Sequence, residues 1–174
     1  MPALLLLRHA KSSWDDPALG DFDRPLAPRG LNAAMRMGTE IANRGWVPDL
    51  ALVSTAVRAR QTWDLAKSRF GPAGETIETR FDRKLYLASP ATMLALLAGA
   101  AAGAETVMIV AHNPGTEMLA MKLAAPDSNL DALALMSQKY PTAALARLEP
   151  AGGWTDMSDH SARLTHFLRP RDLD

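Results

Sequence analysis

The most informative absence in this sequence is that of cysteine. Without cysteine the chain has no disulfide framework, no thiolate nucleophile and no cysteine-ligated zinc or iron–sulfur site. Histidine, present in four copies, is therefore the side chain to follow for nucleophilic or acid–base chemistry.

An excess of charge and a long apolar run are also missing. Lys plus Arg and Asp plus Glu each number 19, so no global field draws the protein to nucleic acid or to an anionic membrane. No apolar run reaches the roughly 18 residues of a membrane span, and no basic residue precedes the apolar stretch 3–7 as it would in a signal peptide. We expect a cytoplasmic protein without nucleic-acid or membrane partners, in which a local cluster holds any bound phosphate.

The length and composition predict a single domain over residues 1–174. A chain of this length with 48% hydrophobic residues can bury a core of its own. No internal repeat, low-complexity segment or linker divides it. The sequence leaves the oligomeric state open.

Short apolar runs alternate with longer amphipathic segments, a pattern typical of an α/β fold. We expect a three-layer α/β/α sandwich whose central sheet is mostly parallel and has an antiparallel edge strand, formed by a terminal hairpin. Methionines at helical spacings, including Met35, Met37, Met118 and Met121, are expected to fill the core. The expected strands are 3–7, 50–53, 76–79, 106–111, 143–148 and 162–168, and the expected helices are 28–44, 57–70, 90–102 and 116–124.

Three of the expected strands end in polar side chains: Arg8 and His9, the segment 54–58, and His112 with Asn113. Ligands of open α/β sheets lie beyond the carboxyl ends of the strands, so these groups should converge. Several cations at one point call for an anion. Phosphate fits best, because arginine offers forked donors to its oxygens and helix N-termini add backbone N–H groups. Each segment alone is equally well explained as ordinary structure; the combination carries the prediction.

The segments Leu7–Ala10, Ser54–Thr62 and Val110–Asn113 resemble, in order and spacing, the motifs of the histidine phosphatase superfamily. The fold expected for such a member is the phosphoglycerate mutase-like one. The short chain is similar to the SixA-type phosphohistidine phosphatase branch, and the resemblance extends from Leu4 to about Leu168.

The resemblance implies that His9 is a nucleophile that becomes phosphorylated, and that Arg8, Arg58 and His112 grip the phosphoryl group. Two further residues are expected to donate hydrogen bonds to the phosphate, Ser54 and Asn113. No cofactor is expected, and no metal, because the two arginines would repel a cation placed between the histidines.

The acid that larger relatives use to protonate the leaving oxygen has no clear counterpart. Asp82 is the only carboxylate in 81–89, and it lies earlier than that acid would. Asp15 stands where many relatives have asparagine, as a shifted loop residue or an unorthodox proton donor. Because an alkoxide needs that proton far more than the imidazole of phosphohistidine does, its absence favours phosphohistidine substrates.

The leading hypothesis is a metal-independent phosphatase that removes phosphoryl groups from phosphohistidine on a signalling or carrier protein. One alternative is a phosphomonoesterase of the same superfamily that acts on a small metabolite. Another is a phosphate-binding or interaction module without catalysis. The expected partner is accordingly a phosphorylated protein or a small phosphorylated substrate.

Overall fold

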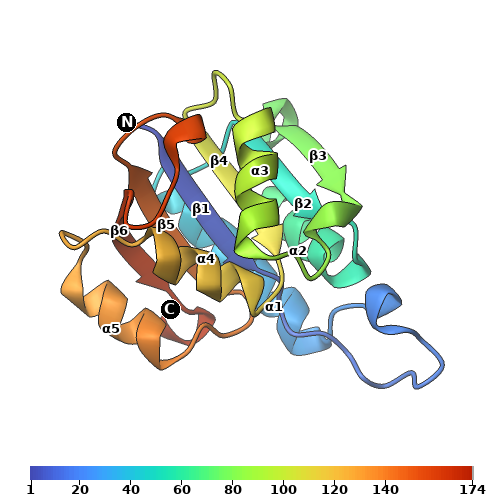
Figure 1. Cartoon of the computed structure of the whole chain (residues 1–174). Coiled ribbons are helices and arrows are strands. Elements are labelled where there is room, and N and C mark those ends of the chain that lie inside the picture. Colours follow the sequence, from blue (N-terminus) through green and yellow to red (C-terminus); the bar gives the residue numbers. More distant parts are fainter. Residues whose placement is uncertain (174) are drawn as a thin grey trace.

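The computed structural model describes residues 1–173, in which helices cover both faces of a six-stranded sheet (Figure 1). The strands are β1 (Ala3–Arg8), β2 (Leu50–Ser54), β3 (Glu78–Asp82), β4 (Thr106–Ala111), β5 (Leu145–Pro150) and β6 (Ala162–Leu168). The helices are α1 (Pro28–Asn43), α2 (Val57–Lys67), α3 (Pro90–Ala100), α4 (Gly115–Leu123) and α5 (Leu130–Gln138). Within the described chain, no helix has the length and apolarity that a membrane crossing requires.

The strand order is β3-β2-β4-β1-β5-β6. The first four strands of this order pair in parallel, β5 runs antiparallel to β1, and β6 runs antiparallel to β5. The prediction of a mostly parallel sheet with an antiparallel hairpin at one edge is confirmed, with β6 as the edge strand. Because β2, β4 and β1 lie side by side and point the same way, their C-terminal ends meet at one edge of the sheet.

Two core clusters show why β1 is apolar over residues 3–7. Successive strand residues point to opposite faces. On one face Leu5 and Leu7 pack with Met37 of α1 and Trp63 of α2.

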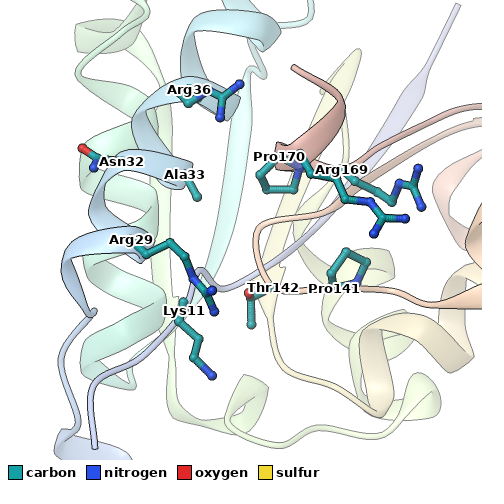
Figure 2. A pocket seen from close by; sticks show the side chains of 10 residues that line it. Lys11, Arg29, Asn32, Ala33, Arg36, Pro141, Thr142, Arg169 and Pro170 are labelled. Carbon is teal, nitrogen blue, oxygen red and sulfur yellow. The ribbon is translucent and has the colours of Figure 1, made fainter. Parts of the chain in front are cut away.

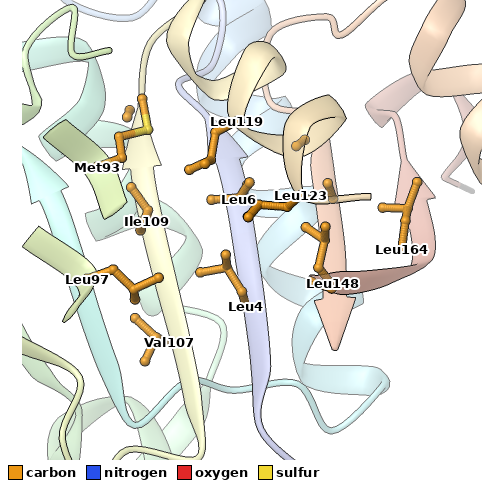
Figure 3. Packing of buried hydrophobic residues seen from close by; sticks show 14 of the residues in the cluster. Leu4, Leu6, Met93, Leu97, Val107, Ile109, Leu119, Leu123, Leu148 and Leu164 are labelled. Carbon is orange, nitrogen blue, oxygen red and sulfur yellow. The ribbon is translucent and has the colours of Figure 1, made fainter. Parts of the chain in front are cut away.

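On the other face, the cluster in Figure 3 joins Leu4 and Leu6 to Met93 of α3 and Leu119 of α4. Helix α5 adds Met136 to the same cluster. Because helices cover both faces, the expected three-layer sandwich is confirmed.

Helix α1 begins with Pro28, as expected from the preference of proline for the first helical turn. Gly45, with a φ of 69°, follows its end. A Cβ on Gly30 would collide with the backbone carbonyl of Lys11. The first turn of α1 therefore packs directly against the loop that follows β1.

Some element boundaries differ from those expected. Helix α2 ends at Lys67 rather than Phe70, and β3 begins two residues later because 71–76 form a 3-10 turn. Helix α5 lies in a stretch for which the sequence patterns predicted no element. Its start is fixed by Asn129, whose side chain accepts a hydrogen bond of 2.9 Å from the backbone N–H of Ala132.

The prediction that the methionines fill the core is wrong for two of them. Met37 is fully buried and Met35 partly so. Met118 and Met121 on α4 are 54% and 40% exposed. Helix α4 presents a different face to the sheet, the one that carries Leu119, so these two methionines point away from the core.

Candidate active site

The polar groups at the strand ends come together as expected. His9 directly follows β1 and His112 directly follows β4, and their ring centroids are 5.1 Å apart. Arg58, in the first turn of α2, places its Nε 3.4 Å from His9 Nε2. Arg8 is the last residue of β1. We call these four residues the histidine–arginine cluster.

The surroundings of His9 fix both its tautomer and its charge. Its Nδ1 lies 2.7 Å from the backbone carbonyl oxygen of Ala10, and only a protonated nitrogen can donate to a carbonyl. Nε2 therefore keeps its lone pair and faces the Arg58 side chain. Burial, with smaller contributions from the nearby Arg58 and Arg8, lowers the pKa of His9 to about 4. At neutral pH His9 is a neutral imidazole whose Nε2 is unprotonated and accepts a hydrogen bond of 3.4 Å from Arg58 Nε.

His112 is equally buried but is held by a side chain. Its Nε2 lies 2.7 Å from Ser54 Oγ, which also accepts a hydrogen bond from the backbone N–H of Ala56. Burial lowers the pKa of His112 to about 3, with smaller contributions from His9 and Arg58. Ser54 thus contacts His112 rather than standing as an independent group at the strand end.

Arg8 and Asn113 donate hydrogen bonds to the same backbone carbonyl, that of Tyr140. Arg8 Nη1 donates to the backbone carbonyl of Tyr140 at 2.9 Å, and Asn113 Nδ2 donates to the same oxygen at 3.2 Å. The Asn113 side chain also bonds Glu117 through both its amide nitrogen and its oxygen. Its polar atoms are thus engaged by the start of α4, and phosphate binding by Asn113 stays a prediction.

Sequence reasoning missed Asp21, which the long loop after β1 brings to the cluster. Arg58 Nη1 donates to the Asp21 backbone carbonyl at 2.6 Å, and Nη2 to Asp21 Oδ2 at 2.9 Å. The Tyr86 hydroxyl donates a short hydrogen bond to the same Oδ2. Arg24, itself anchored on Ser12 Oγ at 2.6 Å, donates to Asp21 Oδ1. Asp21 therefore orients the guanidinium of Arg58.

The charge state of Asp21 follows from these contacts. The hydroxyl of Tyr86 lowers the pKa of the Asp21 carboxyl well below its usual range, and Arg24 and Arg58 lower it further. Burial, followed by the contact with Asp21, raises the pKa of Tyr86. Asp21 is thus a carboxylate and Tyr86 a neutral hydroxyl over the physiological pH range. The one sequence signal that could have found Asp21 is its position three residues before Arg24.

The side chain of Thr62 joins two backbone segments of the cluster. Its Oγ1 accepts a hydrogen bond of 2.9 Å from the backbone N–H of Ala10 and donates one of 2.7 Å to the carbonyl of Arg58. One buried hydroxyl therefore ties the turn after His9 to the first turn of α2.

The two carboxylates considered as proton donors form their hydrogen bonds outside the histidine–arginine cluster. Asp15 is exposed on the loop, where Ser13 Oγ accepts from its backbone N–H. Asp82 caps a 3-10 turn, and its Oδ1 accepts from the backbone N–H of Lys84 at 2.8 Å. Over residues 1–173, no three histidine or acidic side chains are grouped so as to hold a metal ion.

Comparison with known proteins places the chain in a family. A family model described as the histidine phosphatase superfamily (branch 1) matches residues 4–85. A protein assigned as phosphohistidine phosphatase SixA from Agrobacterium tumefaciens is 32% identical, with a TM-score of 0.78 over 97% of this chain and 99% of that chain. The chain belongs to the histidine phosphatase superfamily. Within the superfamily it is SixA-like, and its membership supports phosphatase activity.

Two further relatives extend over nearly the whole chain. A protein assigned as phosphohistidine phosphatase SixA from Nakamurella multipartitia is 29% identical, with a TM-score of 0.80 over 97% of this chain and 96% of that chain. An uncharacterised protein of Mycobacterium tuberculosis is 36% identical over 166 residues, which are 95% of this chain and 100% of the relative.

Proposed function

We propose that this protein is a metal-independent phosphatase that works through a phosphorylated His9 and acts on phosphohistidine of a signalling or carrier protein. The observation that carries the proposal is the hydrogen bond from His9 Nδ1 to the Ala10 carbonyl at 2.7 Å. It leaves Nε2 unprotonated, with its lone pair directed at Arg58 Nε in a buried site. A neutral imidazole with its nitrogen so directed is a competent nucleophile.

The proposed reaction has two displacements at phosphorus. In the first, His9 Nε2 forms a bond to phosphorus while the bond from phosphorus to the substrate nitrogen breaks, and the departing imidazole takes a proton from water. In the second, water attacks the phosphorylated His9, inorganic phosphate leaves and Nε2 regains its lone pair. Division into two steps replaces one difficult displacement by two easier ones.

The remaining members of the cluster would bind the phosphoryl oxygens. Arg58 and Arg8 would neutralise charge on these oxygens. When the Ser54 hydroxyl donates to His112 Nε2, His112 Nδ1 carries a proton and can donate. Among the described residues, the buried Arg8 Nε and His112 Nδ1 have no hydrogen-bond partner. A buried donor without a partner is costly, and a phosphoryl oxygen would satisfy such a donor.

The choice of phosphohistidine over an alkyl phosphate rests on the leaving group. Asp21 is the carboxylate in contact with the cluster, and its lowered pKa leaves it without a proton to give. Asp82 Oδ1 accepts a hydrogen bond from the backbone N–H of Lys84. An alkoxide needs a positioned acid, which commonly contributes about 10²-fold or more to the rate, whereas imidazole can leave as a protonated group without one.

The test is a comparison of two peptides that differ only in the phosphorylated residue, phosphohistidine or phosphoserine. We expect kcat/KM to be at least about 10²-fold higher for phosphohistidine. Similar values that fall together in Asp21→Asn or Asp82→Asn would reveal a working acid and favour the small-metabolite phosphomonoesterase.

Two further measurements address the mechanism. Rapid quenching with labelled substrate should trap an acid-labile, base-resistant phosphoryl group on His9, and turnover without that adduct would contradict the covalent route. A chelator should leave the rate unchanged, whereas a loss that one divalent metal restores would overturn metal independence. A folded protein that binds phosphate but turns over neither peptide nor an aryl phosphate would be the non-catalytic module.

A further inference from the structure

A strongly basic cavity of about 520 Å³ lies between α1 and the segments at Pro141 and Pro170 (Figure 2). Ala33, Pro141 and Pro170 contribute carbon surface to its lining. Five cationic residues line it, and no acidic residue of the described chain does. We call it the basic groove, and its cationic residues are Lys11, Arg29, Arg36, Arg169 and Arg171.

Most of this charge is not neutralised locally. Arg169 is paired, with its Nε 2.6 Å and its Nη2 3.0 Å from the carboxylate of Asp172. The other four cations form no ion pair with any carboxylate of residues 1–173. The formal net charge of the protein is zero, so this concentration reflects the fold and not the composition. Like charges held together repel each other unless an anion joins them.

The groove adjoins the histidine–arginine cluster through the backbone. Lys11 lies two residues after His9, and its carbonyl accepts the N–H of Ala27 just before α1. Ala143, which follows the groove residue Thr142, donates its backbone N–H to the carbonyls of Arg8 and His9. The two segments that flank His9 therefore continue directly into the lining of the groove.

We propose that the basic groove binds an acidic surface of the phosphorylated protein while its phosphoryl group lies in the histidine–arginine cluster. The proposal rests on the function proposed above and assigns a recognition element to it. The partner is defined by carboxylate side chains close to the phosphorylated residue, which would complement the unpaired arginines and lysine.

The dimensions of the groove favour a protein surface over a single small anion. Arg29 and Arg36 are seven residues apart on α1, which corresponds to about 10 Å along the helix axis. Figure 2 shows Lys11 beside Arg29, with Arg36 farther along the helix. In Figure 2 the side chains of Arg29 and Arg36 point away from each other, which suits a chain of carboxylates better than one phosphate-sized ion. The carbon surface of Ala33 and Pro141 adds an area that a hydrated ion would not use.

The test uses two synthetic peptides that carry one phosphohistidine, flanked by glutamates in one and by glutamines in the other. We expect the wild-type kcat/KM for the glutamate peptide to be at least about tenfold higher at low salt, and the difference to shrink at high salt. The variant Arg29→Glu/Arg36→Glu/Arg171→Glu should lose this preference. A matched variant with the same change in net charge, Lys67→Glu/Arg80→Glu/Lys84→Glu, should retain it.

Binding of the unphosphorylated glutamate peptide, followed by fluorescence anisotropy, separates this proposal from the proposed function. Salt-sensitive binding that only the groove variant loses supports the groove, even if no phosphohistidine is hydrolysed; in that case the proposed function alone fails. Equal binding by the groove variant and the matched variant would overturn the groove proposal. Pyrophosphate that displaces the peptide and binds the groove more tightly would overturn it too, in favour of a small-anion site.

Discussion

The histidine–arginine cluster and the basic groove adjoin each other through the backbone, and both are built from basic side chains. They differ in how deeply these side chains are buried and in what the side chains contact. His9, Arg58 and His112 are each less than 10% exposed and are held by hydrogen bonds from the surrounding chain. Arg29 and Arg36 are exposed on α1. Burial makes the histidines neutral and fixes their geometry, which suits chemistry, whereas exposed cations act through charge alone. The two regions should therefore respond differently to the same kind of substitution.

The largest expected effect is that of His9→Ala. It removes the nitrogen that would carry the phosphoryl group, so kcat for phosphohistidine peptide should fall by at least about 10³-fold. The acidic peptide should still bind, because the groove is untouched. Steady-state kinetics measures the loss of turnover, and fluorescence anisotropy on the same sample measures the binding of the peptide. Near-normal turnover would remove His9 from the mechanism.

Arginine-to-lysine substitutions in the two regions sharpen the comparison. Arg58→Lys loses the fork that contacts Asp21 and His9, and kcat/KM should fall about 10²-fold. Arg29→Lys keeps the charge, so Kd for the acidic peptide should change by less than about twofold. Arg60→Lys, on the same helix as Arg58, serves as the control for α2. Equal sensitivity at Arg58 and Arg29 would mean that geometry is not what separates the two regions.

The buried histidines should also make the stability depend on pH. Their folded pKa values of about 4 and about 3 lie below the unfolded value of about 6.5. Between these limits the unfolded chain binds more protons, so the free energy of unfolding should fall by roughly 2 kcal/mol per histidine as the pH drops from about 7 to about 4.5.

Urea unfolding at several pH values measures this slope. Asp21 should not add to it, because its pKa is lowered from an ordinary value that is already below this range. His112→Asn should reduce the pH dependence, with His160→Asn as the control at a histidine outside the cluster. A slope that is the same in all three proteins would contradict the assignment.

Among the substitutions in the histidine–arginine cluster and its contacts, Asp21→Asn should have the smallest effect. The amide oxygen can still accept from Arg58 Nη2, but the negative charge beside the proposed phosphate site is gone. Vanadate inhibition should therefore become several-fold tighter, a change of about 1 kcal/mol. Tyr86→Phe removes the hydroxyl and leaves the carboxylate, so it should not tighten inhibition. A weaker inhibition in Asp21→Asn would show that orientation of Arg58 outweighs charge.

The sequence predicted most of the sheet because each strand is specified locally. β1 and β4 are continuous apolar runs that end in polar residues, and such runs are typical of strands covered on both faces. The convergence of His9 and His112 then follows from the parallel topology. Helix α5 was missed because its apolar face is short, and its signal is a single cap at Asn129.

Local sequence patterns could not predict the loop residues of the site. Asp21 and Tyr86 are separated by 65 positions in the chain, and neither lies in a periodic segment. Their meeting depends on Arg24, which folds the loop back onto Ser12. The exposure of Met118 was likewise decided by the rotation of α4 on the sheet, which its spacing alone did not give.

By itself the sequence determined the fold class, the family and the positions of His9, Arg58 and His112, because adjacency to a buried strand or to the first turn of a helix is a local property. The tertiary structure alone decided the charge and the contacts of these residues. The pKa of His9 depends on burial, the orientation of Arg58 depends on Asp21, and the basic groove gathers cations from separate segments. Burial and electrostatic interactions act through space, so residues distant in sequence set them only after the chain has folded.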